Sequence, residues 1–170
     1  CSEMVIALTG FMGSGKTTIG KALAQKLQGY DFVDSDSEIE KNAGKSINDI
    51  FKDEGEKTFR DMESEFLNKL KVSGDKIILS TGGGMPCHND NYKLIKKIGL
   101  SVYLKTLPAS VYERIKDDTS RPLLKTDDKL GRISKLLSER EEFYEKAADE
   151  IIITDEKTAD EIADEIIRIL

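Results

Sequence analysis

Hydrophobic residues gather in five short runs along this chain, and after each run the apolar residues recur every three or four positions. A short apolar run is typical of a buried strand, whereas the three-to-four spacing is typical of a helix with one buried face. The predicted strands are residues 4–9, 30–34, 76–81, 100–104 and 150–154. The predicted helices are 15–29, a segment around 37–40, 46–71 with a break at Gly55, a segment that starts at 87–88, one that opens at Pro108, 130–147, and one from Thr158 to the end.

Strands and helices therefore alternate five times. This order favours a parallel sheet with right-handed crossovers and helices on both faces. We expect an α/β fold with three layers (α/β/α), a five-stranded parallel sheet and a single domain over residues 1–170.

The turn after the first strand contains a phosphate-binding motif. Residues 10–17 read Gly-Phe-Met-Gly-Ser-Gly-Lys-Thr, a full G-x-x-x-x-G-K-[ST] between a strand and a helix. Its N–H groups and the helix N-terminus suit a polyphosphate, Lys16 suits the β- and γ-phosphates, and Thr17 suits a Mg²⁺ ion. An ordinary glycine-rich turn would explain the glycines but not the Lys and Thr that follow them.

Two carboxylates follow the second strand, at Asp34 and Asp36. Ligands of open α/β sheets gather at the carboxyl ends of the strands, so both side chains are expected near the phosphate loop. A carboxylate there can orient an acceptor hydroxyl and take its proton. Either residue can instead cap the helix that follows, because Asp is favoured at that position.

Two arginines fall on or beside apolar helix stripes. Arg140 lies within the stripe of the 130–147 helix, where it must pair with an internal carboxylate or with a bound acid. Arg60 lies at the margin of another stripe, and an exposed ion pair with Glu63 is the alternative for it. If both point inward, the acceptor carries its own negative charge.

Two further segments suggest ligand contacts. Gly82, Gly83 and Gly84 end the third strand, where they permit close backbone approach to a ligand, although a flexible turn is the alternative. The long polar segment at about 116–129 suggests a mobile flap that carries Arg121. A solvated surface arginine is the alternative for Arg121.

Composition narrows the class of partner. The net charge is −6 with interspersed signs, which argues against a nucleic-acid surface and favours small-molecule partners. No apolar run approaches the ~20 residues that span a bilayer. Cys1 and Cys87 have no metal-type spacing, so a cytoplasmic location is the simplest setting. We take Cys87 and the single histidine, His88, as structural or incidental, and we expect a monomer with no membrane or nucleic-acid partner.

Together these motifs resemble the shikimate kinase family. The residues that carry the resemblance are Gly10 to Thr17, Asp34 with Asp36, Phe59-Arg60 with Glu63, Gly82 to Gly84, Arg121-Pro122-Leu123, and Arg140 with Tyr144 and Ala147. The resemblance implies a P-loop kinase fold, similar to nucleoside monophosphate kinases, with a mobile lid. It also implies transfer of the ATP γ-phosphoryl group to the 3-hydroxyl of shikimate, on the route to aromatic amino acids, with Mg²⁺.

The resemblance assigns roles by position. Catalytic roles fall to Lys16, Asp36 and Arg121; ATP contacts to Gly13, Ser14, Gly15, Lys16, Thr17, Thr18, Arg114 and Arg121; shikimate contacts to Asp36, Arg60, Gly82, Gly83, Gly84 and Arg140; and the metal to Thr17 and Asp34. Two positions stand out. Ser80 replaces the acidic residue usual in Walker-type ATPases, a substitution that the family shares. Residues 155–158 lack the proline expected beside adenine.

Two other functions stay open at this point. A gluconate or nucleoside monophosphate kinase would share the architecture but not the pair of arginines. A guanine-nucleotide switch would carry Asn-Lys-x-Asp, whereas the nearest stretch, Asn68 to Lys71, lacks the aspartate.

Overall fold

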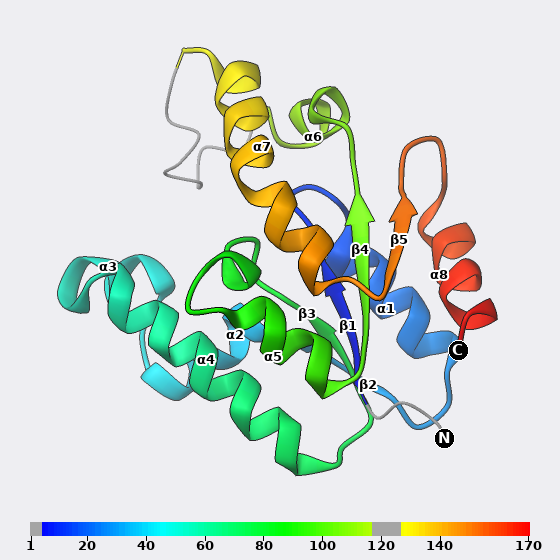
Figure 1. Cartoon of the computed structure of the whole chain (residues 1–170), viewed down its shortest axis with the longest axis horizontal. Helices are drawn as coiled ribbons and strands as arrows, with labels where there is room; N and C mark the ends of the chain where they lie inside the picture. The colour runs from blue at the N-terminus through cyan, green and yellow to red at the C-terminus, as the bar shows by residue number, and fades with distance from the viewer. Residues whose placement is uncertain (1–4, 117–126) are drawn as a thin grey trace.

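The computed structural model describes residues 5–116 and 127–170. Its centre is a parallel sheet in the order β2-β3-β1-β4-β5 (Figure 1). The strands are β1 (Val5–Thr9), β2 (Asp31–Asp34), β3 (Ile77–Ser80), β4 (Leu100–Lys105) and β5 (Glu150–Ile153). The predicted five-stranded parallel α/β fold is confirmed.

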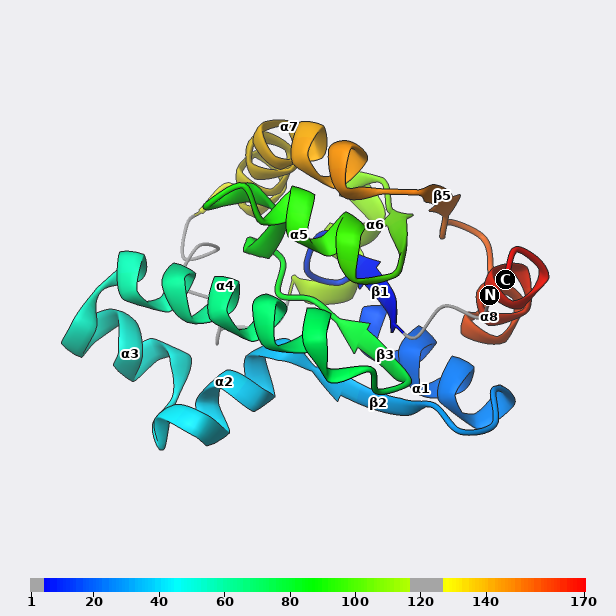
Figure 2. The same cartoon turned by 60° about the horizontal axis from the view of Figure 1, so that its bottom comes forward.

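Helices cover both faces of this sheet (Figure 2). α1 (Lys16–Lys26) and α8 (Ala159–Arg168) pack on one face, while α4 (Glu56–Ser73), α5 (Asn91–Ile98) and the end of α7 (Lys129–Ala147) pack on the other. Strand β1 divides its side chains accordingly. Ile6 and Leu8 join the α1 and α8 cluster, and Val5 and Ala7 join the α4 and α5 cluster. Such a central strand is apolar on both sides because neither face meets water.

Beyond the β2 edge, α2 (Ser35–Ala43), α3 (Ile47–Glu54) and α4 share a small apolar cluster built on Ile39, Ile50 and Phe59. The expected break at Gly55 is present, with φ of 88°. Ser46 caps α3, since its hydroxyl accepts a hydrogen bond from the Asp49 N–H at 3.1 Å. These local signals set the position of α4, which carries Arg60.

α6 (Pro108–Ile115) packs against α7 near the carboxyl end of the sheet, and Pro108 opens it as predicted. The predicted flap at 116–129 spans residues 117–126, so most of it, including Arg121, lies outside the described residues. Within the described ranges, no helix has both the length and the apolar character needed to cross a membrane.

Several predicted boundaries shift. α1 ends at Lys26, three residues before Gly29, and the chain is already extended at Leu27. The segment expected to be helical from 87–88 is instead a short 3-10 turn, η1 (Met85–Cys87), and α5 begins only at Asn91. Asn89 and Asp90 adopt left-handed φ values of 54° and 56°, which interrupt a helix at that point. The last helix begins as predicted, since Thr158 and Glu161 form a capping box at the start of α8.

Candidate active site

The loop between β1 and α1 has the backbone that an anion cradle requires. Gly10, Gly13 and Gly15 have φ values of 148°, 77° and 92°, a region that residues with a side chain rarely adopt. At Gly10 a methyl group would also lie 2.8 Å from the Leu104 carbonyl oxygen. The Lys16 Nζ donates hydrogen bonds to the carbonyl oxygens of Gly10, at 2.7 Å, and Phe11, at 3.1 Å. The lysine is therefore held across the loop.

A cavity of about 290 Å³ opens beside this loop. Three segments line it, namely the loop itself, the end of β2 and the end of β3. The lining residues are Met12, Gly13, Gly15, Lys16, Thr17, Thr18, Asp34, Asp36, Ser80, Thr81, Gly82 and Gly83. The predicted phosphate, metal and acceptor residues at the strand ends are thus brought together around one space.

The two carboxylates after β2 do different things. The Asp34 Oδ1 accepts hydrogen bonds from the N–H groups of Asp36, at 2.9 Å, and Ser37, at 3.3 Å, so the capping alternative is correct for Asp34. Asp36 lies in the first turn of α2, and its Oδ1 is buried without a hydrogen-bond partner among the described residues. Burial, reinforced by Asp34, raises the pKa of Asp36 to about 6, while Lys16 and Arg60 act in the opposite direction.

The glycine turn after β3, Gly82 to Gly84, lies against the side chains of Asp36, Glu63, Arg60 and Arg140. A methyl group on Gly82 would lie 2.7 Å from the Asp36 Oδ1 and 3.2 Å from the Glu63 Oε2. On Gly84 it would lie 2.7 Å from the Arg60 Nη2, and on Gly83 it would lie 3.4 Å from the Arg140 Nη1. None of the three has a φ in the left-handed region. At Gly82 and Gly84 glycine makes room for side chains of α2 and α4 that approach the backbone closely, whereas the α7 side chain beside Gly83 is at an ordinary contact distance.

Arg60 and Glu63 form the ion pair that was the alternative for Arg60, but the pair is not exposed. The Arg60 Nη1 lies 2.8 Å from the Glu63 Oε1, and Glu63 is fully buried. The Glu63 Oε2 has no hydrogen-bond partner in the described part of the chain. Burial raises the pKa of Glu63 to about 7, against the opposing effect of Arg60. The pair therefore belongs to the wall of the site.

Arg140 reaches the site from α7. Its side chain is half-buried beside Gly83, with the Cζ 5.7 Å from the centre of the Phe11 ring. Among the described residues no carboxylate lies within ion-pair distance of it. In this part of the chain Arg140 therefore has no internal carboxylate partner. A guanidinium group in such a position suits a bound acid.

A second cavity, of about 240 Å³, lies on the other side of the phosphate loop. Its wall includes Arg114, whose Nη1 donates a hydrogen bond to the Gly13 carbonyl oxygen at 2.7 Å. It also includes Lys157, from the segment that lacks the expected proline. The Lys157 Nζ forms an ion pair with the Glu165 Oε1 at 2.9 Å. Two tethered cationic side chains thus flank this space, which also touches Ser14 and Thr18.

Sequence patterns missed two residues of the site. The Ser35 Oγ accepts a hydrogen bond from the Gly82 N–H at 3.0 Å, and the Tyr144 hydroxyl donates one to the Gly83 carbonyl oxygen at 2.6 Å. Ser35 lies between two aspartates and gave no signal of its own. Tyr144 carries the family resemblance and lies on the apolar stripe of the 130–147 helix, and neither fact says where its hydroxyl points.

Cys87 and His88 lie near the two arginines without completing a catalytic group. Burial raises the pKa of the half-buried Cys87 thiol to about 11, which disfavours the thiolate. Burial also lowers the pKa of His88, whose Nε2 lies 3.7 Å from the Glu56 Oε1. Nothing in this geometry departs from the structural role expected for both.

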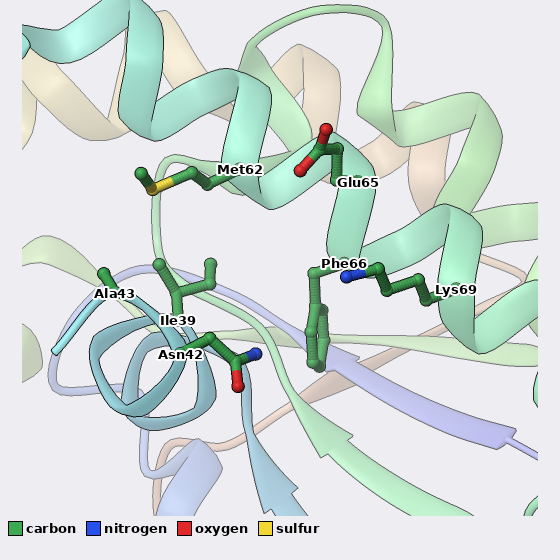
Figure 3. A pocket seen from close by; sticks show the side chains of 7 residues that line it. All are labelled: Ile39, Asn42, Ala43, Met62, Glu65, Phe66 and Lys69. Carbon is green, nitrogen blue, oxygen red and sulfur yellow. The ribbon is translucent and has the colours of Figure 1, made fainter.

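A third hollow, of about 210 Å³, lies between α2 and α4 (Figure 3). Its wall is mixed, with polar as well as apolar side chains, and shares no residue with the cavity at the phosphate loop. The residues that line it are Ile39, Asn42, Ala43, Met62, Glu65, Phe66 and Lys69.

Residues 12–170 match the family model described as shikimate kinase. This chain belongs to the shikimate kinase family. A shikimate kinase of Caldicellulosiruptor bescii is 44% identical over 160 residues, which cover 92% of each chain. The structure of a shikimate kinase from Acinetobacter baumannii in complex with shikimate is 37% identical, covers 99% of this chain and 93% of the other, and superposes with a TM-score of 0.90.

More distant structures share the fold of this shikimate kinase family member. A deoxyadenosine kinase from M. mycoides, solved with bound dCTP, has a TM-score of 0.60 at 22% identity, with 98% of this chain and 100% of the other covered. At that identity the likeness concerns the fold alone. The P-loop kinase architecture expected from the sequence is confirmed. As a member of a kinase family, the chain takes ATP as a substrate and acts on a small molecule.

Proposed function

We propose that this chain transfers the γ-phosphoryl group of ATP to the 3-hydroxyl of shikimate and so forms shikimate 3-phosphate, on the route to chorismate and the aromatic amino acids. One observation carries the proposal beyond family membership. Arg60 and Arg140 come from different helices and lie against neighbouring glycines, Gly84 and Gly83, of the turn that also walls the phosphate-loop cavity. Two guanidinium groups beside a kinase site suit an acceptor that carries a carboxylate.

On the donor side, the loop supplies positive charge for the polyphosphate. The N–H groups of Gly13, Ser14 and Gly15 and the N-terminus of α1 suit the phosphate oxygens. Lys16 moves from its carbonyl partners to the β- and γ-phosphates, and Thr17 and Thr18 complete the contacts. The adenine base of ATP occupies the second cavity, with Arg114 against one side of it.

Mg²⁺ fits the residues present. The Thr17 hydroxyl and the Asp34 carboxylate line the same cavity, and both present the oxygen ligands that Mg²⁺ prefers. The Oδ1 of Asp34 is engaged by the cap of α2, so its Oδ2 is the atom for the metal or for a water bound to it. Few protein ligands are needed, because Mg²⁺ keeps several waters and binds substrate phosphates. When bound, the ion neutralises charge that builds on the phosphates.

On the acceptor side, Asp36 orients the hydroxyl and accepts its proton. Arg60 and Arg140 hold the carboxylate of shikimate, and Gly82, Gly83 and Gly84 contact the same substrate through their backbone. The acceptor oxygen then bonds to the γ-phosphorus as the bond to the β-phosphate oxygen breaks, ADP leaves, and the proton resides on Asp36. A pKa of about 6 keeps Asp36 largely ionised at pH 7 and still basic enough for this role.

Arg121 and the lid at 116–129 belong to the proposal on sequence grounds alone. We propose that the lid closes over ATP, that Arg121 adds positive charge at the transferred phosphoryl group, and that closure excludes water. We also propose a cytoplasmic monomer without nucleic-acid or membrane partners. The net charge of −6, with signs interspersed, supports the absence of a nucleic-acid partner.

A coupled assay of ADP release tests the function. ATP and Mg²⁺ are supplied with shikimate, gluconate, AMP or CMP in separate reactions. We expect turnover with shikimate and background rates with the other three. Turnover with a nucleotide or with gluconate but not with shikimate would contradict the proposal, and tight binding of GTP without any phosphoryl transfer would favour a nucleotide switch instead.

A further inference from the structure

Tyr144 connects α7 to the glycine turn through a single hydrogen bond. The residue lies one turn beyond Arg140 and is fully buried, and its hydroxyl donates to the Gly83 carbonyl oxygen at 2.6 Å. Its ring packs on Tyr103, with the ring centres 5.2 Å apart. The same helix therefore supplies both a guanidinium group beside Gly83 and a hydroxyl that binds the Gly83 carbonyl.

The two ends of the glycine turn are fixed by other bonds. The Gly82 N–H donates to the Ser35 Oγ at 3.0 Å, and the Met85 N–H donates to the Gly82 carbonyl at 3.1 Å. The Gly84 carbonyl accepts from the Cys87 N–H at 3.0 Å. None of these bonds involves the peptide group between Gly83 and Gly84. Tyr144 supplies the one hydrogen bond found for this group in the described part of the chain.

This peptide joins two glycines, Gly83 and Gly84. Neither Gly83 nor Gly84 has a side chain, so rotation about their bonds meets little steric resistance. In a trans peptide the C=O of one residue and the N–H of the next point in opposite directions. The Gly83 carbonyl points toward Tyr144, so the Gly84 N–H points away from it. A peptide flip would reverse both groups.

We infer that Tyr144 is a positioning residue of the acceptor site: its hydroxyl holds the Gly83–Gly84 peptide in the orientation that presents the Gly84 N–H to the anionic acceptor. The inference rests on the proposed function for the identity of that acceptor. The N–H has no hydrogen-bond partner among the described residues, and Arg60 and Arg140 flank its two glycines. One backbone donor and two guanidinium groups then converge on the acceptor. Tyr144 acts on the backbone donor through the Gly83 carbonyl, and its hydroxyl also interacts with the Arg140 side chain, so the Gly83–Gly84 peptide has to be observed directly as well as through the KM for shikimate.

Tyr103 offers a matched control. It is also buried, it stacks on Tyr144, and its hydroxyl has no hydrogen-bond partner in the described ranges. Tyr144→Phe and Tyr103→Phe therefore remove the same atom from the same aromatic pair, but only the first removes a bond to the glycine turn. A role limited to core packing would give both variants similar kinetics.

The test measures KM for shikimate, KM for ATP and kcat for both variants and the wild type. From the net free energy that one hydrogen bond contributes, we predict that the KM for shikimate of Tyr144→Phe rises roughly 3- to 10-fold. We expect its KM for ATP to stay within about twofold of the wild type, and Tyr103→Phe to match the wild type in all three constants. Equal shikimate KM values for the two variants, or equal rises in both KM values for Tyr144→Phe, would overturn the inference.

An NMR measurement on glycine-labelled protein does not depend on the substrate. The amide signals of Gly83 and Gly84 are expected to shift or broaden in Tyr144→Phe and to stay in place in Tyr103→Phe. Unchanged signals in Tyr144→Phe would contradict the claim that the Tyr144 hydroxyl fixes the orientation of the Gly83–Gly84 peptide. A wild type without shikimate turnover would instead overturn the proposed function and, with it, the acceptor contact of the Gly84 N–H, so the two failures are distinguishable.

Discussion

The Arg60 Nη1 and the Glu63 Oε1 lie 2.8 Å apart on α4, with 11% of the arginine side chain exposed and the glutamate fully buried. The spacing is that of a common surface pair, yet residues from other elements cover it. Gly82 lies against the Glu63 Oε2, and Gly84 lies against the Arg60 guanidinium. The pair therefore connects the stability of the site to acceptor binding.

Arg60→Ala is expected to lower the free energy of unfolding by about 3 kcal/mol, because removal of one partner leaves a buried charge uncompensated. Protonation of Glu63, whose pKa is about 7, limits the loss at lower pH. Urea denaturation at pH 8 and pH 6 measures both effects. The double variant with Glu63→Gln is expected to recover part of the stability and none of the shikimate affinity. Unchanged stability of Arg60→Ala at pH 8 would show that the buried pair contributes nothing.

Asp36→Asn is expected to keep the fold and the affinity for ATP and to lose most phosphoryl transfer. In the wild type, kcat/KM is expected to fall as the pH drops through about 6, because the protonated carboxyl cannot accept the hydroxyl proton. Steady-state rates between pH 5 and pH 8, with ATP binding measured by calorimetry, check both points. Near-normal activity of the variant would exclude Asp36 as the base.

Gly84→Ala is expected to impair the acceptor site without a large loss of stability. The φ of Gly84 is −92°, so alanine meets no backbone strain, but its methyl group would lie 2.7 Å from the Arg60 Nη2 and displace the guanidinium. Loss of a charge-assisted contact predicts a KM for shikimate about 10-fold higher, with the KM for ATP little changed.

Gly83→Ala is the comparison for that variant, since the nearest atom to its methyl group would be the Arg140 Nη1 at 3.4 Å, an ordinary contact distance. A smaller rise in the KM for shikimate is expected. If Gly83→Ala is the more damaging of the two, displacement of Arg60 is not the cause.

Arg114→Ala and Lys157→Ala are expected to raise the KM for ATP and to leave the KM for shikimate unchanged. Both side chains wall the second cavity, where a cation beside an aromatic base contributes roughly 0.5–2 kcal/mol. Lys157 is already engaged by Glu165, so its variant is expected to have the smaller effect. Initial rates with each substrate varied in turn measure this, and a rise confined to the KM for shikimate would move both residues to the acceptor side.

Patterns along the sequence predicted the strands, the order of the helices and the phosphate loop because each depends on neighbouring residues. Apolar runs mark strands, and the motif at Gly10 to Thr17 specifies its own backbone. For Asp34 the sequence left capping and a ligand role open, and the structure shows the cap, which is a local interaction. Neighbouring residues did not predict the end of α1 before Leu27 or the start of α5 at Asn91, because one or two backbone angles decide where these helices end or begin.

Contacts between distant segments could not be predicted in this way. The pairing of Arg60 with Glu63 is visible in the i,i+3 spacing, but its burial depends on Gly82 and Gly84, about 20 residues away in sequence. The Tyr144 hydroxyl meets a carbonyl 61 residues away, which no helical period reveals. Family resemblance pointed to these positions without giving the geometry that connects them.

A crystal structure with shikimate and ADP tests the central claim most directly. The account predicts that the carboxylate of shikimate lies within hydrogen-bond distance of both Arg60 and Arg140 and that its 3-hydroxyl lies at the Asp36 carboxylate, facing the phosphate loop. Shikimate bound with its carboxylate toward Lys16, or bound away from the two arginines, would contradict it.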